Sequence, residues 1–174
     1  MTEIVIDTNV LLVADRRADQ MDDECVSACV NRLARAKADD VVVLDDAWLI
    51  LGEYGNKLST RGAPTPGNEF FKWLLQVQAD TRHVSQVAIT PRNPEQTLFA
   101  EFPPDSELES KFDPADRKFV AVACAHPRRP PILQAADSKW LAWEKPLKQH
   151  GLRVDFLCRA ALAQIKKRKA KTPR

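Results

Sequence analysis

Short runs of β-branched residues alternate with helical patterns along the chain, and this alternation is the feature that most limits the fold. Between the runs, apolar residues recur at the three- and four-residue spacing of one helix face. Runs typical of strands occupy residues 3–6, 41–44, 84–89, 132–134 and 152–155. Because strands that alternate with helices form parallel sheets covered on both sides, we expect an α/β fold, a three-layer α/β/α sandwich with a mainly parallel central sheet.

The segments between the strands differ in character. Residues 59–68 hold Gly62, Pro64, Pro66 and Gly67, which is typical of a loop. The stretch Pro91–Phe112 is rich in proline and acidic residues, and we expect a long surface excursion there with one short helix over Thr97–Phe102. The remaining helices are expected over residues 21–36, 47–58, 69–78, 114–125, 138–150 and 156–169.

The length of 174 residues fits one domain with a proper core, which we assign to residues 1–165, followed by a basic tail over 166–174. A hydrophobic content of 44% and a charged content of 29% are ordinary for a globular protein. With a net charge of only +2, any nucleic-acid affinity has to come from local basic patches. The tail is either such a patch, for RNA or a protein partner, or a solvated helix end.

Other features suggest a cytoplasmic protein. No apolar run reaches the roughly 20 residues of a membrane span, and the acidic start of the chain does not resemble a signal peptide. The four cysteines lack the close pairing typical of zinc sites, so we expect all of them to be reduced, partly buried apolar residues. The tryptophans are expected mostly in the core; Trp140 is also near enough to the candidate site to stack on a base.

Four acidic residues occur where a charge is hard to explain by structure alone. Asp7 ends the first strand, and Asp137 follows the strand over 132–134. Because ligands bind outside the carboxyl ends of parallel strands, both are expected at one edge of the sheet. Glu53 and Asp116 fall on apolar helix faces, where a carboxylate needs a partner or a metal ion. Together the four predict a site for Mg²⁺ or Mn²⁺, since clustered carboxylates repel one another without a cation.

Each acid also has a plain structural explanation. Asp7 and Asp137 fit turn or helix-capping roles. Glu53 has Lys57 at the favourable i+4 position, and Asp116 fits as a first-turn charge of a helix capped by Asp113. Taken one at a time, these explanations are as good as the metal site. The set of four favours the metal site.

The same residues resemble the PIN-domain ribonuclease family. The opening stretch 4–12 is similar to its first motif, and Glu53 within 48–54 is similar to its helix-borne glutamate. The stretches 116–123 and 136–140 resemble its third and last motifs. The likeness covers nearly the whole chain, although the region between the second and third motifs is longer than in compact members. It implies a parallel α/β/α sandwich whose acids bind Mg²⁺ or Mn²⁺ and cleave RNA to a 5′-phosphate and a 3′-hydroxyl.

Further residues are assigned supporting roles around Asp7, Glu53, Asp116 and Asp137. Small polar or acidic residues next to them are expected to orient ligands or waters, or to act only in turns and caps: Thr8, Asn9, Asp113 and Ser138. Basic residues near them are expected to contact the RNA backbone, or simply to be solvated: Lys57, Arg61, Arg117, Lys118 and Lys139.

We therefore expect a metal-dependent endoribonuclease, with RNA as substrate. Family resemblance adds three expectations, namely a toxin role in a toxin–antitoxin pair, a small antitoxin partner, and a homodimer. The alternative is a catalytically silent PIN-like module that binds RNA or protein. A phosphatase of the haloacid-dehalogenase type is disfavoured, because Asn9 stands where that chemistry needs an aspartate.

Overall fold

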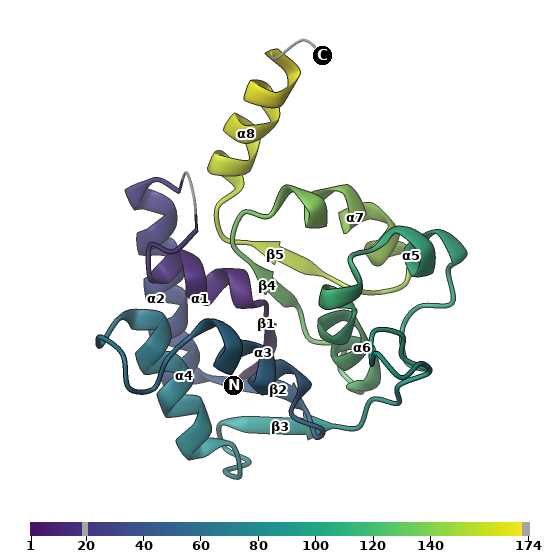
Figure 1. Cartoon of the computed structure of the whole chain (residues 1–174), viewed down its shortest axis with the longest axis horizontal. Helices are drawn as coiled ribbons and strands as arrows, with labels where there is room; N and C mark the ends of the chain where they lie inside the picture. Colours follow the sequence, from purple (N-terminus) through teal and green to yellow (C-terminus); the bar gives the residue numbers. More distant parts are fainter. Residues whose placement is uncertain (19–20, 172–174) are drawn as a thin grey trace.

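The computed structural model describes residues 1–18 and 21–171 and shows one five-stranded sheet with helices on both sides (Figure 1). All neighbouring strands pair in parallel, in the order β3-β2-β1-β4-β5. This confirms the predicted α/β sandwich. The strands are β1 (Thr2–Ile6), β2 (Asp40–Asp45), β3 (Val84–Val87), β4 (Ile132–Gln134) and β5 (Val154–Phe156).

The helices form two layers around the sheet. Figure 1 shows α1, α2 and α4 on one side of it and α5, α6 and α7 on the other. Helix α3 contacts both α4 and α6, so it connects the two helix layers. The helices are α1 (Thr8–Ala14), α2 (Asp23–Asp39), α3 (Leu49–Lys57), α4 (Pro66–Val77), α5 (Ser106–Lys111), α6 (Arg117–Ala125), α7 (Ser138–Gln149) and α8 (Arg159–Lys171).

The core lies on both faces of the central strands. In β1 the residues Ile4, Val5 and Ile6 are at most 1% exposed, and the facing helix α6 is buried from Phe119 to Ala123. A strand covered on both faces needs a continuous apolar run rather than alternation, which is the pattern that the sequence shows. Each large apolar side chain buried in this way contributes about 1.5–3 kcal/mol to stability.

Two helices were placed wrongly or not at all by the sequence. No element was predicted over residues 8–14, where α1 forms with Asp7 as its cap. The short helix predicted over Thr97–Phe102 is absent, and α5 forms instead at Ser106–Lys111, where Asp105 accepts hydrogen bonds from two backbone N–H groups. The prediction failed there because a capping aspartate decides where so short a helix begins.

The stretch Pro91–Phe112 is also less superficial than predicted. Its apolar side chains Phe99, Phe102, Leu108 and Phe112 are all at most 4% exposed and belong to the core. The segment therefore packs as part of the domain rather than lying over its surface.

The cysteines differ from the prediction as well. Cys25 and Cys158 form a disulfide bond, so the expectation that all four cysteines are reduced is wrong for this pair. Cys29 and Cys124 are free thiols. The disulfide joins the first turn of α2 to the residue before α8 and links positions 133 residues apart.

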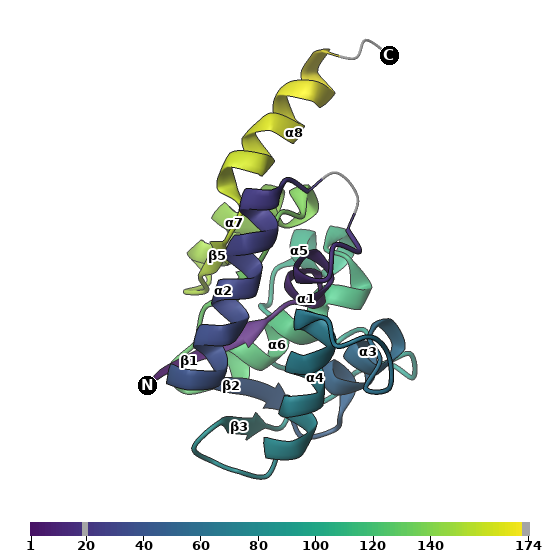
Figure 2. The same cartoon turned by 90° about the vertical axis from the view of Figure 1, so that its left-hand side faces the viewer.

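Helix α8 projects from the rest of the molecule in both views (Figures 1 and 2). It runs without a break across the boundary predicted between residues 165 and 166, and residues 172–174 of the predicted tail lie outside the described residues. Ala161 and Leu162 of its first turn are buried. None of the helices that the structure describes is long and apolar enough to cross a membrane.

Three of the four tryptophans agree with the predicted core role. Trp140 is 1% exposed, and Trp73 and Trp143 are partly buried against the core. Trp48 is 50% exposed at the start of α3, so its core assignment is wrong.

Candidate functional site

The site lies where the strand order changes direction. From β1 the chain proceeds to β2 and β3 on one side, and it returns on the other side of β1 to form β4 and β5. Parallel α/β sheets bind ligands at such a switch point, outside the carboxyl ends of the strands. Asp7 directly follows β1, and Asp137 follows β4 after two alanines. Both acids therefore stand at the expected edge, on neighbouring strands.

Asp7 is the most buried of the four predicted acids, at 4% exposed. Its carboxylate accepts a hydrogen bond of 2.8 Å from the backbone N–H of Asn9, which caps α1. Burial raises the pKa of Asp7 well above its usual value, and the negative charges of Asp116 and Glu53 raise it further. The capping explanation is thus correct, but it does not account for a buried acid that faces two others.

Glu53 reaches the same place from α3. The Thr8 hydroxyl donates to Glu53 Oε1 at 2.5 Å, and the Lys118 ammonium pairs with Glu53 Oε2. This carboxylate is therefore held from both sides, by a residue next to Asp7 and by one from α6. The predicted i+4 partner Lys57 is exposed at the end of the same helix.

Helix α3 is itself fixed to the sheet edge at two points. Asp45, the last residue of β2, accepts hydrogen bonds from the N–H groups of Leu49 at 2.7 Å and Ile50 at 2.9 Å. The buried hydroxyl of Tyr54 donates to the carbonyl of Ile6 at 2.5 Å. Because Tyr54 is the neighbour of Glu53, this bond sets the rotation of the helix that carries the acid.

Asp116 comes from the 3-10 turn Pro114–Asp116, directly before α6. The indole N–H of Trp140 donates to Asp116 Oδ2 at 3.1 Å. Burial is the main cause that raises the pKa of Asp116 to about 6, with further increases from the charges of Asp113, Glu53 and Asp137. The ammonium of Lys118 acts in the opposite direction.

Asp137 lies at the rim of this group. It is half-buried and caps α7 by accepting a hydrogen bond of 2.8 Å from the N–H of Lys139. Ser138 is the first residue of α7 and is also half-buried. All four predicted acids thus meet at one edge, but they are not drawn tightly together. Among the residues that the structure describes, no three carboxylate groups bring oxygens within 4.8 Å of one another.

The other polar residues predicted around the acids connect the loops. Asn9 Oδ1 accepts a hydrogen bond of 3.4 Å from the N–H of Ala136, which joins the segment after β1 to the segment after β4. Asp113 accepts from the N–H of Ala115 at 3.1 Å and from the ammonium of Lys139 at 3.2 Å. Thr8 and Asn9 therefore hold the acids in place, and Asp113 holds a lysine at the rim.

The five predicted basic residues do not form one surface. Lys57, Arg61 and Lys139 are exposed, whereas Arg117 and Lys118 are buried. Arg117 donates to the carbonyl oxygens of Phe112 at 2.9 Å and of Thr97 at 3.4 Å. It thereby anchors the stretch before α6 rather than facing a ligand.

Lys118 has a role that the sequence did not suggest. Its ammonium pairs with Glu53, donates to the carbonyl of Ala115, and lies 4.9 Å from the centre of the Phe119 ring. Lys118 is an internal counter-ion for the acids. The one signal in the sequence is that α6 is apolar on every side after this residue, so a charge in its first turn needs a buried partner.

A pocket of about 430 Å³ opens beside Asp116. Its walls combine the aromatic residues Phe112 and Trp143 with two lysines, Lys111 and Lys139. The full lining is Lys111, Phe112, Asp113, Pro114, Asp116, Lys139, Trp140, Ala142 and Trp143. Aromatic faces next to cations suit a stacked base with a nearby phosphate. The sequence did not predict this pocket, because α5, which contributes Lys111, was placed elsewhere.

Comparisons of the chain with family models, with curated proteins and with solved structures found no match. The resemblance to PIN-domain ribonucleases therefore stays a prediction.

The raised pKa of Asp116 predicts how pH affects stability. Below about pH 3.8, its usual pKa, the carboxyl is protonated in both the folded and the unfolded chain and costs nothing. As the pH rises to about 6, the unfolded chain ionises more easily, so the folded protein loses stability. Replacing Asp116 by Asn should therefore stabilise the metal-free protein at pH 7 by about 2–3 kcal/mol.

Urea unfolding of wild type and Asp116→Asn at several pH values measures this difference. The two proteins should differ little at pH 3.5 and increasingly toward pH 7, which makes the acidic measurement an internal control. If Asp116→Asn is as stable as wild type at pH 7, or less stable, the ionised carboxylate does not destabilise the fold.

Proposed function

We propose that this protein is a metal-dependent endoribonuclease of the PIN type, which holds Mg²⁺ or Mn²⁺ among Asp7, Glu53, Asp116 and Asp137. The observation that carries the proposal is that four acids, from separate parts of the chain, reach the edge of the sheet at its switch point. Carboxylate oxygens are the ligands that both ions prefer.

The charges at the site fit a divalent cation. Asp7 and Asp116 have raised pKa values because they are buried and because negative neighbours surround them. Lys118 supplies a single positive charge against this group, and it pairs with Glu53. A divalent cation would ionise the acids and would compete with Lys118 for Glu53. Among the described residues, no three carboxylates each place an oxygen within 4.8 Å of the others, which is wider than the ligand spacing around one ion. The side chains therefore have to move toward a bound ion.

In the proposed reaction, a water oxygen bonds to the phosphorus of RNA, the bond to the 3′ oxygen breaks, and that oxygen takes a proton. A bound Mg²⁺ or Mn²⁺ would supply an activated water and would neutralise charge on the phosphate. The protein holds the acids ready for this task. Asn9 fixes Asp7, Thr8 fixes Glu53, and Trp140 fixes Asp116, each by a hydrogen bond. Restricting the rotation of these carboxylates lowers the cost of placing them around an ion.

Lys118 provides a direct test of the competition between cations. In the Lys118→Met variant, Glu53 has no ammonium partner, so Mn²⁺ no longer has to displace one. We expect Mn²⁺ to bind about tenfold more tightly, because a neighbouring unit charge is worth more than about 1.4 kcal/mol at this range. Isothermal titration calorimetry measures the change. Lys148→Met is the matched control, since that lysine lies in the last turn of α7, at the opposite end of the helix from Asp137. Equal Mn²⁺ affinity in wild type and Lys118→Met would refute the competition.

The pocket beside Asp116 is the proposed RNA contact. Replacing both Lys111 and Lys139 by Ala should weaken the binding of single-stranded RNA. The slope of log K against log salt should fall by about 1.4, because each phosphate that the protein no longer neutralises contributes about 0.7. Fluorescence anisotropy at several salt concentrations measures the slope. The control replaces Lys145 and Lys148, which lie on α7 outside this pocket, and should leave the slope unchanged. Equal slopes for both double variants would move the RNA elsewhere.

One observation favours the alternative, a PIN-like module without catalysis. Lys118 already neutralises part of the acidic group, so the site is tolerable without a metal ion. This alternative predicts no Mn²⁺ binding at millimolar concentrations by wild type or by Lys118→Met. Under it, the pocket and the exposed basic side chains of α8, such as Lys167 and Lys171, would bind RNA without cleaving it.

The biological setting belongs to the same proposal. A toxin role, a small antitoxin that covers the acidic edge, a homodimer and a cytoplasmic location follow from family resemblance and sequence pattern. Copurification of a small protein with the tagged chain from its own cells, abolished when the acidic edge is mutated, tests the antitoxin.

A further inference from the structure

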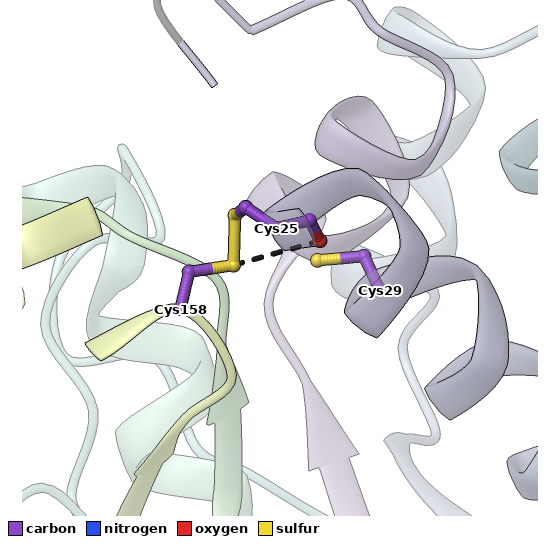
Figure 3. A group of neighbouring side chains, drawn as sticks. All are labelled: Cys25, Cys29 and Cys158. Atoms are coloured by element: carbon purple, nitrogen blue, oxygen red, sulfur yellow. Dashed lines mark hydrogen bonds between the residues drawn. A yellow bond between two sulfur atoms is a disulfide. The ribbon is translucent and has the colours of Figure 1, made fainter. Parts of the chain in front are cut away.

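A second candidate metal site lies between α2 and the residue before α8 and consists of sulfur atoms. The Sγ atoms of Cys25, Cys29 and Cys158 all lie within 4.8 Å of one another, and all three residues are buried (Figure 3). Figure 3 shows the sulfur of Cys29 directed toward the bonded pair. Among the described residues, no other group of three His, Cys, Asp or Glu side chains places its ligand atoms within 4.8 Å of one another.

The three sulfurs come from two elements that are far apart in the sequence. Cys25 and Cys29 are one turn apart on α2, so their side chains share a face. Cys158 follows β5 and accepts the first helical hydrogen bond of α8 through its carbonyl. The thioether sulfur of Met21 lies 3.6 Å from the sulfur of Cys25, so a fourth sulfur borders the three cysteines.

We propose that, when the Cys25–Cys158 disulfide is reduced, these three cysteines form a zinc-type site that binds a thiophilic divalent cation. A tetrahedral zinc ion with bonds of about 2.3 Å holds its sulfur ligands about 3.8 Å apart. The sulfur of Cys29 already lies within 4.8 Å of the other two, and once the disulfide is reduced the sulfurs of Cys25 and Cys158 have to separate to reach this spacing. In the oxidised protein, two of the three ligands are consumed by the disulfide. Metal binding and disulfide formation are therefore mutually exclusive.

Two of the three sulfurs lie at helix N-termini, and a pocket gives access to the disulfide. Cys25 lies in the first turn of α2 and Cys158 directly precedes α8, so the positive ends of two helix dipoles converge on the sulfurs. A pocket of about 270 Å³, lined in part by Cys25, Cys158 and Arg159, opens onto the disulfide. The pocket gives a reductant a route from solvent to the disulfide.

The chemistry requires a two-electron reductant. A dithiol donates two electrons and two protons to the Cys25–Cys158 bond, becomes a cyclic disulfide, and leaves two free thiols beside Cys29. Binding of Zn²⁺ then releases up to three protons as the thiols become thiolates. In a reducing compartment the metal-bound form is favoured, and in an oxidising one the disulfide.

Cobalt provides a visible probe for the site. Protein reduced by a phosphine, which becomes the phosphine oxide, is freed of reductant without oxygen and titrated with Co²⁺. We expect thiolate-to-cobalt charge-transfer bands in the near ultraviolet that saturate at one equivalent and disappear when Zn²⁺ is added. The oxidised protein and the reduced Cys29→Ser variant should lack them. Cys124→Ser is the matched control, because that thiol lies outside the cluster, and it should retain them.

A second measurement covers the case in which Cys29→Ser does not fold. Zn²⁺ should protect three of the four thiols of the reduced wild type from alkylation, as counted by mass spectrometry. Folded, reduced wild type that gives no charge-transfer band and no protection would overturn the proposal, as would a Cys29→Ser variant that keeps the full signal. Asp7→Asn should leave the thiolate bands unchanged, so this result is independent of the carboxylate site.

Discussion

The Asp7→Asn variant is expected to fold normally and to lose about 10³-fold of any metal-dependent ribonuclease activity. Asp7 is 4% exposed and the most buried of the four acids, so among the proposed ligands its carboxylate is the one that solvent can least replace. Loss of one metal ligand removes several kcal/mol of transition-state stabilisation, and a 10³-fold loss corresponds to about 4 kcal/mol. Asn keeps the shape of the side chain and the acceptor for the N–H of Asn9, so α1 remains capped.

Cleavage of a fluorescent RNA in the presence of Mg²⁺ or Mn²⁺ measures this effect. Asp22→Asn is a matched control, since Asp22 caps α2 with a hydrogen bond of the same length, 2.8 Å, to the N–H of Cys25. Both variants should show the circular dichroism of wild type, and Asp22→Asn should keep its activity. An active, folded Asp7→Asn protein would remove the carboxylate from the mechanism.

The second large effect concerns the disulfide. Cys25 and Cys158 are 133 residues apart, so their bond restricts most of the unfolded chain. Chain entropy for a loop of this length predicts a stabilisation of about 5 kcal/mol, and removal of native disulfides typically costs about 2–5 kcal/mol. We therefore expect Cys158→Ser to lower the free energy of unfolding of the oxidised protein by about 4 kcal/mol, which is a large part of a typical domain's stability.

Urea unfolding of both proteins without metal gives this difference from the midpoints and slopes. Cys124→Ser, which removes a free and half-buried thiol, should change the free energy by less than about 1 kcal/mol. If Cys158→Ser and wild type unfold at the same urea concentration, the bond does not constrain the chain as the structure indicates.

The sequence was sufficient to predict the sheet and its acidic edge. The central strands β1, β2 and β4 are largely apolar runs buried on both faces, and parallel pairing then places Asp7 and Asp137 at one edge by geometry alone. Local chemistry was harder to predict. Helix α1 was missed because its seven residues follow the strand without a loop, and α5 was misplaced because its start depends on Asp105.

Contacts between distant residues could not be read from the chain. The pairing of Lys118 with Glu53 depends on how α3 and α6 face each other, which side-chain periodicity does not specify. The disulfide was missed for a similar reason, since the closest pair in sequence, Cys25 and Cys29, is not the bonded pair. A cysteine one residue before a helix carries no local sign of its partner.

The central claim is that Asp7, Glu53, Asp116 and Asp137 share a divalent cation, and calorimetric titration with Mn²⁺ tests it most directly. The oxidised protein is used, so that the disulfide keeps the cysteines from contributing. We predict saturable binding with a Kd below 1 mM for wild type and its loss in Asp7→Asn and Asp116→Asn. Absence of saturable heat in folded wild type at millimolar Mn²⁺, or an unchanged isotherm in both variants, would contradict it.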